Sequence, residues 1–240
     1  MKLQNILFLA ANTKRSHIYA QAMAHYKLLP ENVVIFGQSP QALLSWKNAS
    51  PAEFFIRSFA PKSGEKLSDT FHKTATHVKI LKSRGVNDPR VFREVSELRP
   101  NLIVYSGYSG EIVSSKILKL GIPILHFHAG LLPKYKGSTT TYYSWLLENK
   151  CGVSAIIIDE NIDTGRIVAK KSYPVPPRGV DMDDFYDSSI RADLMVKVLK
   201  NYCLKEKLSS FNNSKKSENT FYIIHPLLKH IILRSQESIE

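Results

Sequence analysis

The chain has 240 residues, a formal net charge of +12 and two cysteines, Cys151 and Cys203. A chain of this length has room for one large domain, or for one domain with a small appendage, and needs no disulfides to be stable. The cysteines lack C-x-x-C spacing and therefore indicate neither a disulfide framework nor a zinc site. Residues 6–11 are too short an apolar run for a signal peptide, and no run reaches the ~20 apolar residues of a membrane span. We expect a soluble, cytoplasmic protein with no membrane partner.

The basic charge raises the question of a nucleic-acid partner, because clustered Lys and Arg side chains bind phosphates. The positive residues are scattered along the chain, and groups such as residues 14–15 and 215–216 are short. We therefore expect a solvated basic surface or a cleft for one nucleotide, and no nucleic-acid partner.

Apolar, β-rich runs alternate with helical patterns in the first half of the chain. Strands are predicted at residues 5–11, 33–36 and 77–81, and helices from Ser16 and at residues 88–98. Residues 41–70 give only a weak signal. A strand at residues 102–105 then runs into a glycine-rich turn, followed by a helix at 114–120 and a strand at 123–128. This alternation predicts a parallel sheet, whose ligands bind beyond the carboxyl ends of the strands.

The second half predicts a helix at residues 140–147, strands at 152–158 and 166–173, and a long amphipathic helix at 183–204. Residues 212–219 are polar. The apolar tail at residues 221–233 is expected to pack back onto the body, where it would seal the monomer or form a homodimer. The predicted fold is therefore α/β and Rossmann-like, a mostly parallel twisted sheet with helices on both faces. Residues 1–178 would form the main domain, and residues 179–240 a helix and docked tail within it.

Two histidines and an acidic turn are the residues best suited to chemistry. His126 and His128 lie two positions apart in a predicted strand, so both imidazoles face the same side. The turn DENIDTG follows the next strand and contains Asp163. A carboxylate beside an imidazole fixes its tautomer and prepares it to transfer a proton. Taken alone, the two histidines also fit buried structural histidines, or two metal ligands with Asp163 as a third, and Asp-Thr-Gly also marks aspartic proteases and ordinary turns.

Together these segments resemble the 10-formyltetrahydrofolate-dependent formyltransferases. That family carries N-x-H-x-S-L-L-P-x-x-x-G followed by a D-x-G turn. The chain reads HFHAGLLPKYKG and then GVSAIIIDENIDTGRIV. The resemblance covers residues 101–177 well and the N-terminal layers in outline, and it implies the formyltransferase fold with 10-formyltetrahydrofolate as cosubstrate.

The resemblance implies catalytic roles for three residues. His128 falls on the family's catalytic histidine and Asp163 on its catalytic aspartate. His126 replaces the family's asparagine, which donates a hydrogen bond to the formyl oxygen as negative charge builds there, and Gly130 replaces a serine. An imidazole can also donate such a bond, and losing an oxyanion donor raises a barrier by ~2.7–4 kcal/mol. No metal is required for the transfer.

The family holds the folate pterin mainly with main-chain groups. By position, these come from the turn after residue 105 and from the acidic turn, and the residues are Ser109, Gly110, Glu111, Ile112, Asp159 and Glu160.

The acceptor amine in this family belongs to glycinamide ribonucleotide, methionyl-tRNA or a nucleotide-linked amino sugar. The sequence after residue 177 is expected to be too short for the tRNA-binding β-domain, and residues 10–14 lack the glycines of a phosphate loop. The run GSTTTYYS beside HFH looks like the sugar enzymes of nonulosonic, pseudaminic-type pathways. We therefore expect a nucleotide-linked 4-amino-6-deoxy sugar as partner, with hydroxyl and aromatic side chains facing it. Its expected contacts are Asn12, Lys14, Lys134, Thr139 and Tyr142.

Two other functions remain open from the sequence. Folate deformylases share the fold and use water in place of an amine. A folate- or nucleotide-binding homologue without catalysis would also carry these motifs, with the asparagine-to-histidine change at position 126 having removed the activity.

Overall fold

The structure is a computed structural model. It describes residues 1–45, 59, 61–213 and 219–235. Much of the weakly patterned stretch at 41–70, and residues 214–218 of the polar stretch, therefore lie outside the described residues. Within the described part, no helix is long and apolar enough to cross a membrane.

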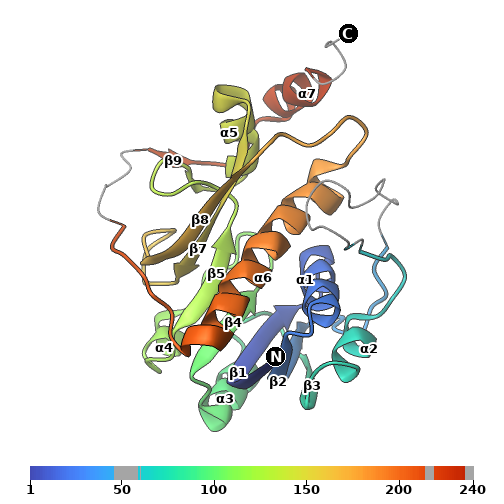
Figure 1. The fold of residues 1–240 in the computed structure, drawn as a ribbon, viewed down its shortest axis with the longest axis vertical. Coiled ribbons are helices and arrows are strands. Elements are labelled where there is room, and N and C mark those ends of the chain that lie inside the picture. The colour runs from blue at the N-terminus through green and yellow to red at the C-terminus, as the bar shows by residue number, and fades with distance from the viewer. Residues whose placement is uncertain (46–58, 60, 214–218, 236–240) are drawn as a thin grey trace.

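A seven-stranded sheet forms the centre of the molecule, in the order β3-β2-β1-β4-β5-β7-β8 (Figure 1). The pairs from β3 to β5 are parallel, while β7 runs antiparallel to β5 and to β8. The prediction of a mostly parallel sheet is thus confirmed. The strands span Lys2–Ala11 (β1), Leu29–Gly37 (β2), His77–Lys82 (β3), Leu102–Ser106 (β4), Ile124–His128 (β5), Cys151–Ile157 (β7) and Ile167–Tyr173 (β8).

Helices cover both faces of this sheet, as the sequence predicts (Figure 1). The helices α1, α2 and α6 share one apolar core with the sheet, and α3 and α4 share the other. Their bounds are Lys14–His25 (α1), Leu67–His72 (α2), Pro89–Leu98 (α3), Ser115–Leu118 (α4), Thr140–Glu148 (α5), Asp187–Lys205 (α6) and Pro226–Arg234 (α7).

The central strand β1 shows why the strand sequences read as continuous apolar runs. Ile6 and Phe8 pack into the core on one face, whereas Leu7 and Leu9 pack into the core on the other. A strand covered on both faces must be apolar at every position, so the alternation typical of half-exposed strands is absent.

Two helix starts differ from the predicted ones. The first helix begins at Lys14, because Thr13 has an extended backbone and its side chain accepts a hydrogen bond from the Ser16 amide. Thr13 is therefore the N-cap, and the helix starts before Ser16, the start that the sequence predicts. The long C-terminal helix is preceded by a π-helical turn at Met182–Tyr186, so its regular part starts later than expected.

The loop between β1 and α1 is held by a buried amide and imidazole. The Asn12 side chain donates to the carbonyls of Ser39 and Ala42, at 3.1 and 2.8 Å, and its oxygen lies 2.9 Å from His17 Nε2. Burial lowers the pKa of His17 to about 4, although a backbone hydrogen bond with Glu65 opposes this shift. His17 is therefore neutral in the folded protein near pH 7.

The C-terminal tail contacts the body less extensively than its sequence predicts. The short strand β9 (Thr220–Phe221) pairs in parallel with β6 (Lys136–Gly137), and α7 lies beside α5 (Figure 1). The side chains of Ile224 and Ile232 are buried, yet many of the other apolar side chains are exposed, among them Tyr222, Ile223, Leu227 and Ile231. The tail therefore contacts the body through few of its apolar side chains.

We predict that Thr139→Val loosens this tail. The Thr139 hydroxyl accepts a hydrogen bond from the Ile224 amide at 2.9 Å and donates to the Tyr222 carbonyl at 3.3 Å. Valine keeps the shape but loses both bonds, which weakens docking by about 1–2 kcal/mol. Limited proteolysis followed by mass spectrometry should show faster cleavage after residue 219. The control is Thr76→Val at an exposed position, and equal cleavage rates in the two variants would contradict the assignment.

His17 should make stability depend on pH. The folded pKa lies below the unfolded value of about 6.5, so the unfolded state binds a proton first as the pH falls. The stabilisation by neutral His17 is complete above pH 6.5 and is lost between pH 6.5 and 4, by about 2–3 kcal/mol at pH 4.5.

The measurement is urea unfolding of the wild type and His17→Gln at several pH values. The variant should be less stable at pH 7.5, and the difference should shrink toward pH 4.5. His72→Gln is the control, since His72 is exposed. A difference that stays constant with pH would show that His17 does not titrate in this range.

Candidate functional site

The carboxyl ends of β1, β4 and β5 meet at one edge of the sheet, where the sequence predicts a site. The strands are parallel, and their register pairs Ala10 with Ser106 and Val104 with Leu125. The first turn of α1, the turn after β4 and the His126–His128 strand end therefore lie together at this edge.

His128 and Asp163 are in contact, as the sequence interpretation required. His128 Nδ1 lies 3.3 Å from Asp163 Oδ1, and the imidazole is 5% exposed. The other carboxylate oxygen of Asp163 accepts the Gly137 amide at 2.9 Å. The acid is thus tied to the loop that follows β5 as well as to the histidine.

The backbone of the acidic turn explains how Asp163 reaches His128. Since β7 runs antiparallel to β5 and its end pairs with Leu125, the following loop must turn back along the sheet. Asp163 adopts a left-handed conformation with φ of 53°, which aspartate tolerates better than most residues. A Cβ at Gly165 would lie 1.8 Å from the Ile157 carbonyl oxygen, so only glycine fits there. The D-x-G spacing therefore has a steric cause.

Both ring nitrogens of His128 face oxygen atoms. Nε2 lies 2.7 Å from the Tyr135 carbonyl and Nδ1 faces Asp163. Burial lowers the pKa of His128, and the Asp163 carboxylate and the Tyr135 carbonyl oppose that shift. Burial thus disfavours a positive charge on the His128 ring, whereas the Asp163 carboxylate and the Tyr135 carbonyl can each accept a hydrogen bond from a protonated ring nitrogen. Such opposing effects suit a group that takes up and releases a proton.

His126 is a different kind of imidazole. Its Nδ1 is buried and has no hydrogen-bond partner among the described residues. Burial lowers the pKa of His126 well below the usual value, and the positive charges of Arg15 and Arg191 lower it further, against a backbone hydrogen bond with Tyr105. His126 is therefore neutral, with one ring nitrogen left for a ligand.

An arginine that the sequence interpretation missed supports the strand between the two histidines. Arg191 on α6 donates to the Phe127 carbonyl at 3.0 Å and forms an ion pair with Asp187, with 2.7 Å between Nη2 and Oδ2. Thr141 donates to the same carboxylate at 3.2 Å. The only signal in the sequence was an Asp and an Arg four residues apart in a helix, and nothing there indicated which strand they would meet.

The turn after β4 is the segment that we expect to bind folate, and its Glu111 side chain holds it in place. Ser109, Gly110 and Ile112 are exposed, and the Ile112 carbonyl accepts the Asn87 side-chain amide at 2.8 Å. The Glu111 carboxylate accepts the Val86 amide at 2.6 Å and lies 3.3 Å from the Tyr105 hydroxyl, so it holds the turn in place. Gly110 has φ of 76° and open space where a Cβ would lie. The backbone at Gly110 is thus accessible to a ligand.

The acidic turn supplies the other expected folate residues. Asp159 accepts the Asn161 amide at 3.1 Å and the Thr164 hydroxyl at 2.7 Å, so its carboxylate shapes the turn. Glu160 is exposed. The folate roles of Asp159 and Glu160 stay predictions.

The five expected acceptor contacts are engaged within the protein. Asn12 uses its amide to hold the loop after β1, as described above. Lys14 forms an ion pair with Asp184 at 2.6 Å, and Lys134 is paired with Glu148. Thr139 anchors the tail, and the buried Tyr142 donates to Asp183 at 2.9 Å. The sequence showed that these side chains are polar or aromatic. It did not show that partners within the fold already form hydrogen bonds or ion pairs with them.

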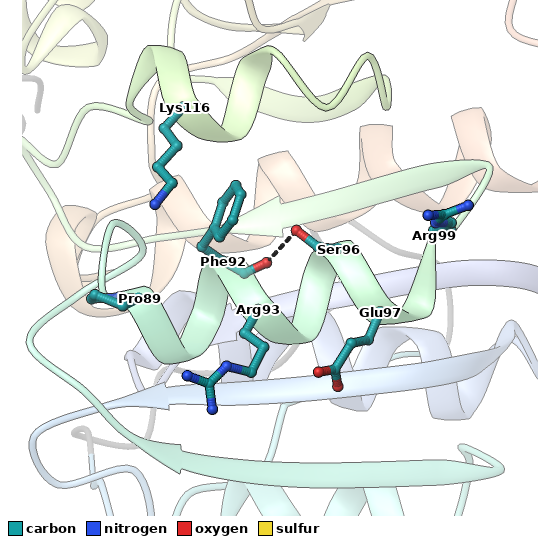
Figure 2. Close-up of a pocket in the computed structure, with 7 residues that line it drawn as sticks. All are labelled: Pro89, Phe92, Arg93, Ser96, Glu97, Arg99 and Lys116. Atoms are coloured by element: carbon teal, nitrogen blue, oxygen red, sulfur yellow. Dashed lines mark hydrogen bonds between the residues drawn. The ribbon is translucent and has the colours of Figure 1, made fainter.

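A surface pocket lies apart from these residues, on α3 and α4 (Figure 2). Its lining includes the basic side chains of Arg93, Arg99 and Lys116, and the Lys116 ammonium lies 4.3 Å from the centre of the Phe92 ring. None of the residues expected at the site lines this pocket. Among the described residues, no three His, Cys, Asp or Glu side chains gather as metal ligands would.

Comparison with known proteins agrees with the site geometry. The sequence pattern of the family "Formyl transferase" matches residues 4–198. The methionyl-tRNA formyltransferase of Finegoldia magna is 29% identical over 146 residues, which are 59% of this chain and 44% of that protein. The chain therefore spans less than half the length of this relative.

Solved structures show the same fold. A sugar N-formyltransferase from a Shewanella species has a TM-score of 0.56 and 15% identity, over 95% of this chain and 86% of that chain. A 4-N formyltransferase from Francisella tularensis has a TM-score of 0.56 and 14% identity, with the same coverage. Members of the matching family take their formyl group from 10-formyltetrahydrofolate. The chain belongs to the formyl transferase family.

Proposed function

We propose that this protein is a cytoplasmic sugar N-formyltransferase, which moves a formyl group from 10-formyltetrahydrofolate to the amino group of a nucleotide-linked amino sugar. The contact of His128 with Asp163 carries this proposal, because a buried imidazole beside a carboxylate at this edge of the sheet suits proton transfer. A 4-amino-6-deoxy sugar of the pseudaminic type is the acceptor that we propose. The homodimer expected from the apolar tail belongs to the same proposal, and exposed Leu227 and Ile231 suit it.

The amine nitrogen attacks the formyl carbon of the donor, so that a new C–N bond forms and the bond from that carbon to the folate nitrogen breaks. The Asp163 carboxylate orients His128, and the proton that leaves the attacking nitrogen passes through His128 to the folate nitrogen, which departs as tetrahydrofolate. The Tyr135 carbonyl, 2.7 Å from Nε2, stabilises the ring while it carries that proton. Both interactions hold the ring in one orientation, which limits the reorganisation needed when the proton moves.

The residues around the site fit a folate cosubstrate. His126 Nδ1 and Arg15 Nε are buried nitrogens that have no hydrogen-bond partner among the described residues, and a polar group of the ligand would satisfy them. The accessible backbone at Gly110 suits a flat ring that is held by main-chain groups. In the folate-binding part of the proposal, Ser109 and Gly110 offer their backbone, while Glu111, Ile112 and Asp159 keep the two turns in shape and Glu160 lies on the rim.

The choice of acceptor rests on likeness of fold. The Shewanella sugar N-formyltransferase matches almost the whole of this chain, which agrees with a nucleotide-linked sugar. A methionyl-tRNA formyltransferase from Clostridium thermocellum shares the fold at the same TM-score of 0.56. A second candidate acceptor is methionyl-tRNA, favoured by the sequence relatives and by the net charge of +12. These two acceptors differ so much in size and charge that one assay separates them.

The test of the proposed function incubates the protein with 10-formyltetrahydrofolate and a panel of nucleotide-linked amino sugars, or methionyl-tRNA. Release of tetrahydrofolate that depends on an amino sugar supports the proposal, with the N-formyl sugar identified by mass spectrometry. Release that depends on methionyl-tRNA supports the second candidate. Release without any amine indicates a hydrolase, and folate binding without turnover indicates a non-catalytic homologue.

We predict that His128→Ala and Asp163→Asn each lower kcat by about 100- to 10,000-fold, the range typical of lost acid–base catalysis. The Tm and circular dichroism spectrum of Asp163→Asn should stay near those of the wild type, because the amide still accepts the Gly137 bond. His72→Ala, at an exposed position, is the matched control. Wild-type kcat in either site variant would remove the catalytic assignment.

His126→Asn tests how position 126 works. If His126 replaces the amide donor that the family carries there, the variant should keep kcat within about tenfold of the wild type, since one good donor replaces another. A loss as large as that of His128→Ala would mean that the imidazole itself is needed.

A further inference from the structure

Arg15 lies at the same edge of the sheet as the two histidines. It belongs to the first turn of α1, and its guanidinium donates to the Gly107 carbonyl, just beyond the end of β4. The β4–β5 register pairs Val104 with Leu125, and continuing it along both strands puts Gly107 level with His128. The Arg15 guanidinium is therefore on the rim of the candidate site, on the β1 and β4 side.

The charges around Arg15 do not balance. Asp187 is paired with Arg191 and Asp163 with His128, and the neighbouring Lys14 takes up Asp184. Arg15 forms no ion pair with any of the described residues. The site thus holds two guanidinium groups, while the Asp187 carboxylate is already fully engaged by one of them.

The Nε of Arg15 is buried and has no hydrogen-bond partner among the described residues. Burial and the charge of Arg191 lower the pKa of Arg15. The surroundings therefore disfavour the positive charge of the Arg15 guanidinium. Buried donors in folded proteins are normally bonded, and a guanidinium stays charged at any ordinary pH. A guanidinium that lacks an ion pair and has a buried Nε without a partner among the described residues is costly unless a ligand completes it.

We propose that Arg15 is a substrate-binding residue that holds an anionic group, a phosphate or a carboxylate, of one of the two substrates of the proposed formyl transfer. Oxyanions of this shape suit the planar fork of a guanidinium, which can donate two parallel bonds to them. His126 Nδ1 is also buried with no hydrogen-bond partner among the described residues. It lies within the electrostatic reach of Arg15 and offers a further polar contact.

Each substrate of the proposed reaction carries such a group. A nucleotide-linked sugar has a diphosphate, and a folate has the carboxylates of its glutamate. Lys14 beside Arg15 adds positive charge to this corner, although Asp184 offsets it. The inference rests on the proposed function only for the identity of the ligand, since the unpaired charge is a property of the fold.

The experiment measures binding and turnover separately. Isothermal titration calorimetry gives the Kd of the wild type, Arg15→Gln and Arg15→Lys for UDP, dTDP and GDP, and for 5-formyltetrahydrofolate, which carries the folate carboxylates. Arg93→Gln is the matched control, an exposed arginine on α3. We expect Arg15→Gln to weaken one class of ligand by about 10- to 100-fold. Arg15→Lys keeps the positive charge but not the planar fork of the guanidinium, so its Kd should lie between those of the wild type and Arg15→Gln. The Kd of the control should match that of the wild type.

The affected ligand identifies the source of the anion. Weaker nucleotide binding, with a raised KM for the amino acceptor, assigns Arg15 to the acceptor. Weaker binding of 5-formyltetrahydrofolate, with a raised KM for the donor, assigns it to the folate. The effect should also shrink at high salt, because screening weakens the interaction in the wild type.

Three results would overturn the inference. They are unchanged Kd values in both arms, a fall in kcat with both KM values unchanged, and a wild type that binds neither class of ligand. If Arg15→Gln does not fold, Arg15→Lys decides, since wild-type affinity at wild-type Tm would refute it. If nucleotide or folate binding depends on Arg15 but the protein transfers no formyl group, the inference is supported and the proposed function is wrong.

Discussion

The 3.3 Å contact between His128 and Asp163 depends on three segments being held in fixed relation. The imidazole of His128 lies at the end of strand β5. The antiparallel strand β7 runs beside β5 in the opposite direction, and the turn that follows β7, which contains Gly165, returns the Asp163 carboxylate to His128. The turn works because the Ile157 carbonyl leaves no room for a side chain at position 165. A change in the β5–β7 register by one residue would move the histidines to the opposite face of the sheet, so the pairing of these two strands underlies the whole site.

Burial organises the electrostatics of the site. His126 and His128 both titrate below the usual pKa, because the low-polarity surroundings and nearby guanidinium groups disfavour further positive charge. Asp163 opposes this effect at His128, while His126 has no such carboxylate. Two imidazoles two residues apart therefore differ in surroundings: a carboxylate opposes the lowering of the pKa of His128, and none of the causes of the shift at His126 is a carboxylate. Their roles should not be interchangeable, although both point to the same edge of the sheet.

The body of the molecule satisfies many of the polar groups that line this edge. Asn12, Lys14 and Tyr142 each have partners within the fold, so they position loops and helices more directly than they contact a ligand. Arg15 and His126 differ from these residues, because each has a buried nitrogen without a partner among the residues that the structure describes. A satisfied polar group stabilises the scaffold, whereas an unsatisfied one has free energy to gain from a ligand.

The sequence by itself determined the layer architecture and the motif. Apolar runs of strand length separated by helical patterns are set by local residue order, and the HFH segment, the LLP loop and the D-x-G turn lie on the chain at readable spacings. Only the tertiary structure decided which charges meet. Arg191 contacts the Phe127 carbonyl across 64 residues and Lys14 meets Asp184 across 170, and the apolar tail remains largely exposed. Such pairings follow from how helices and loops pack in three dimensions, and side-chain spacing along one chain does not encode them.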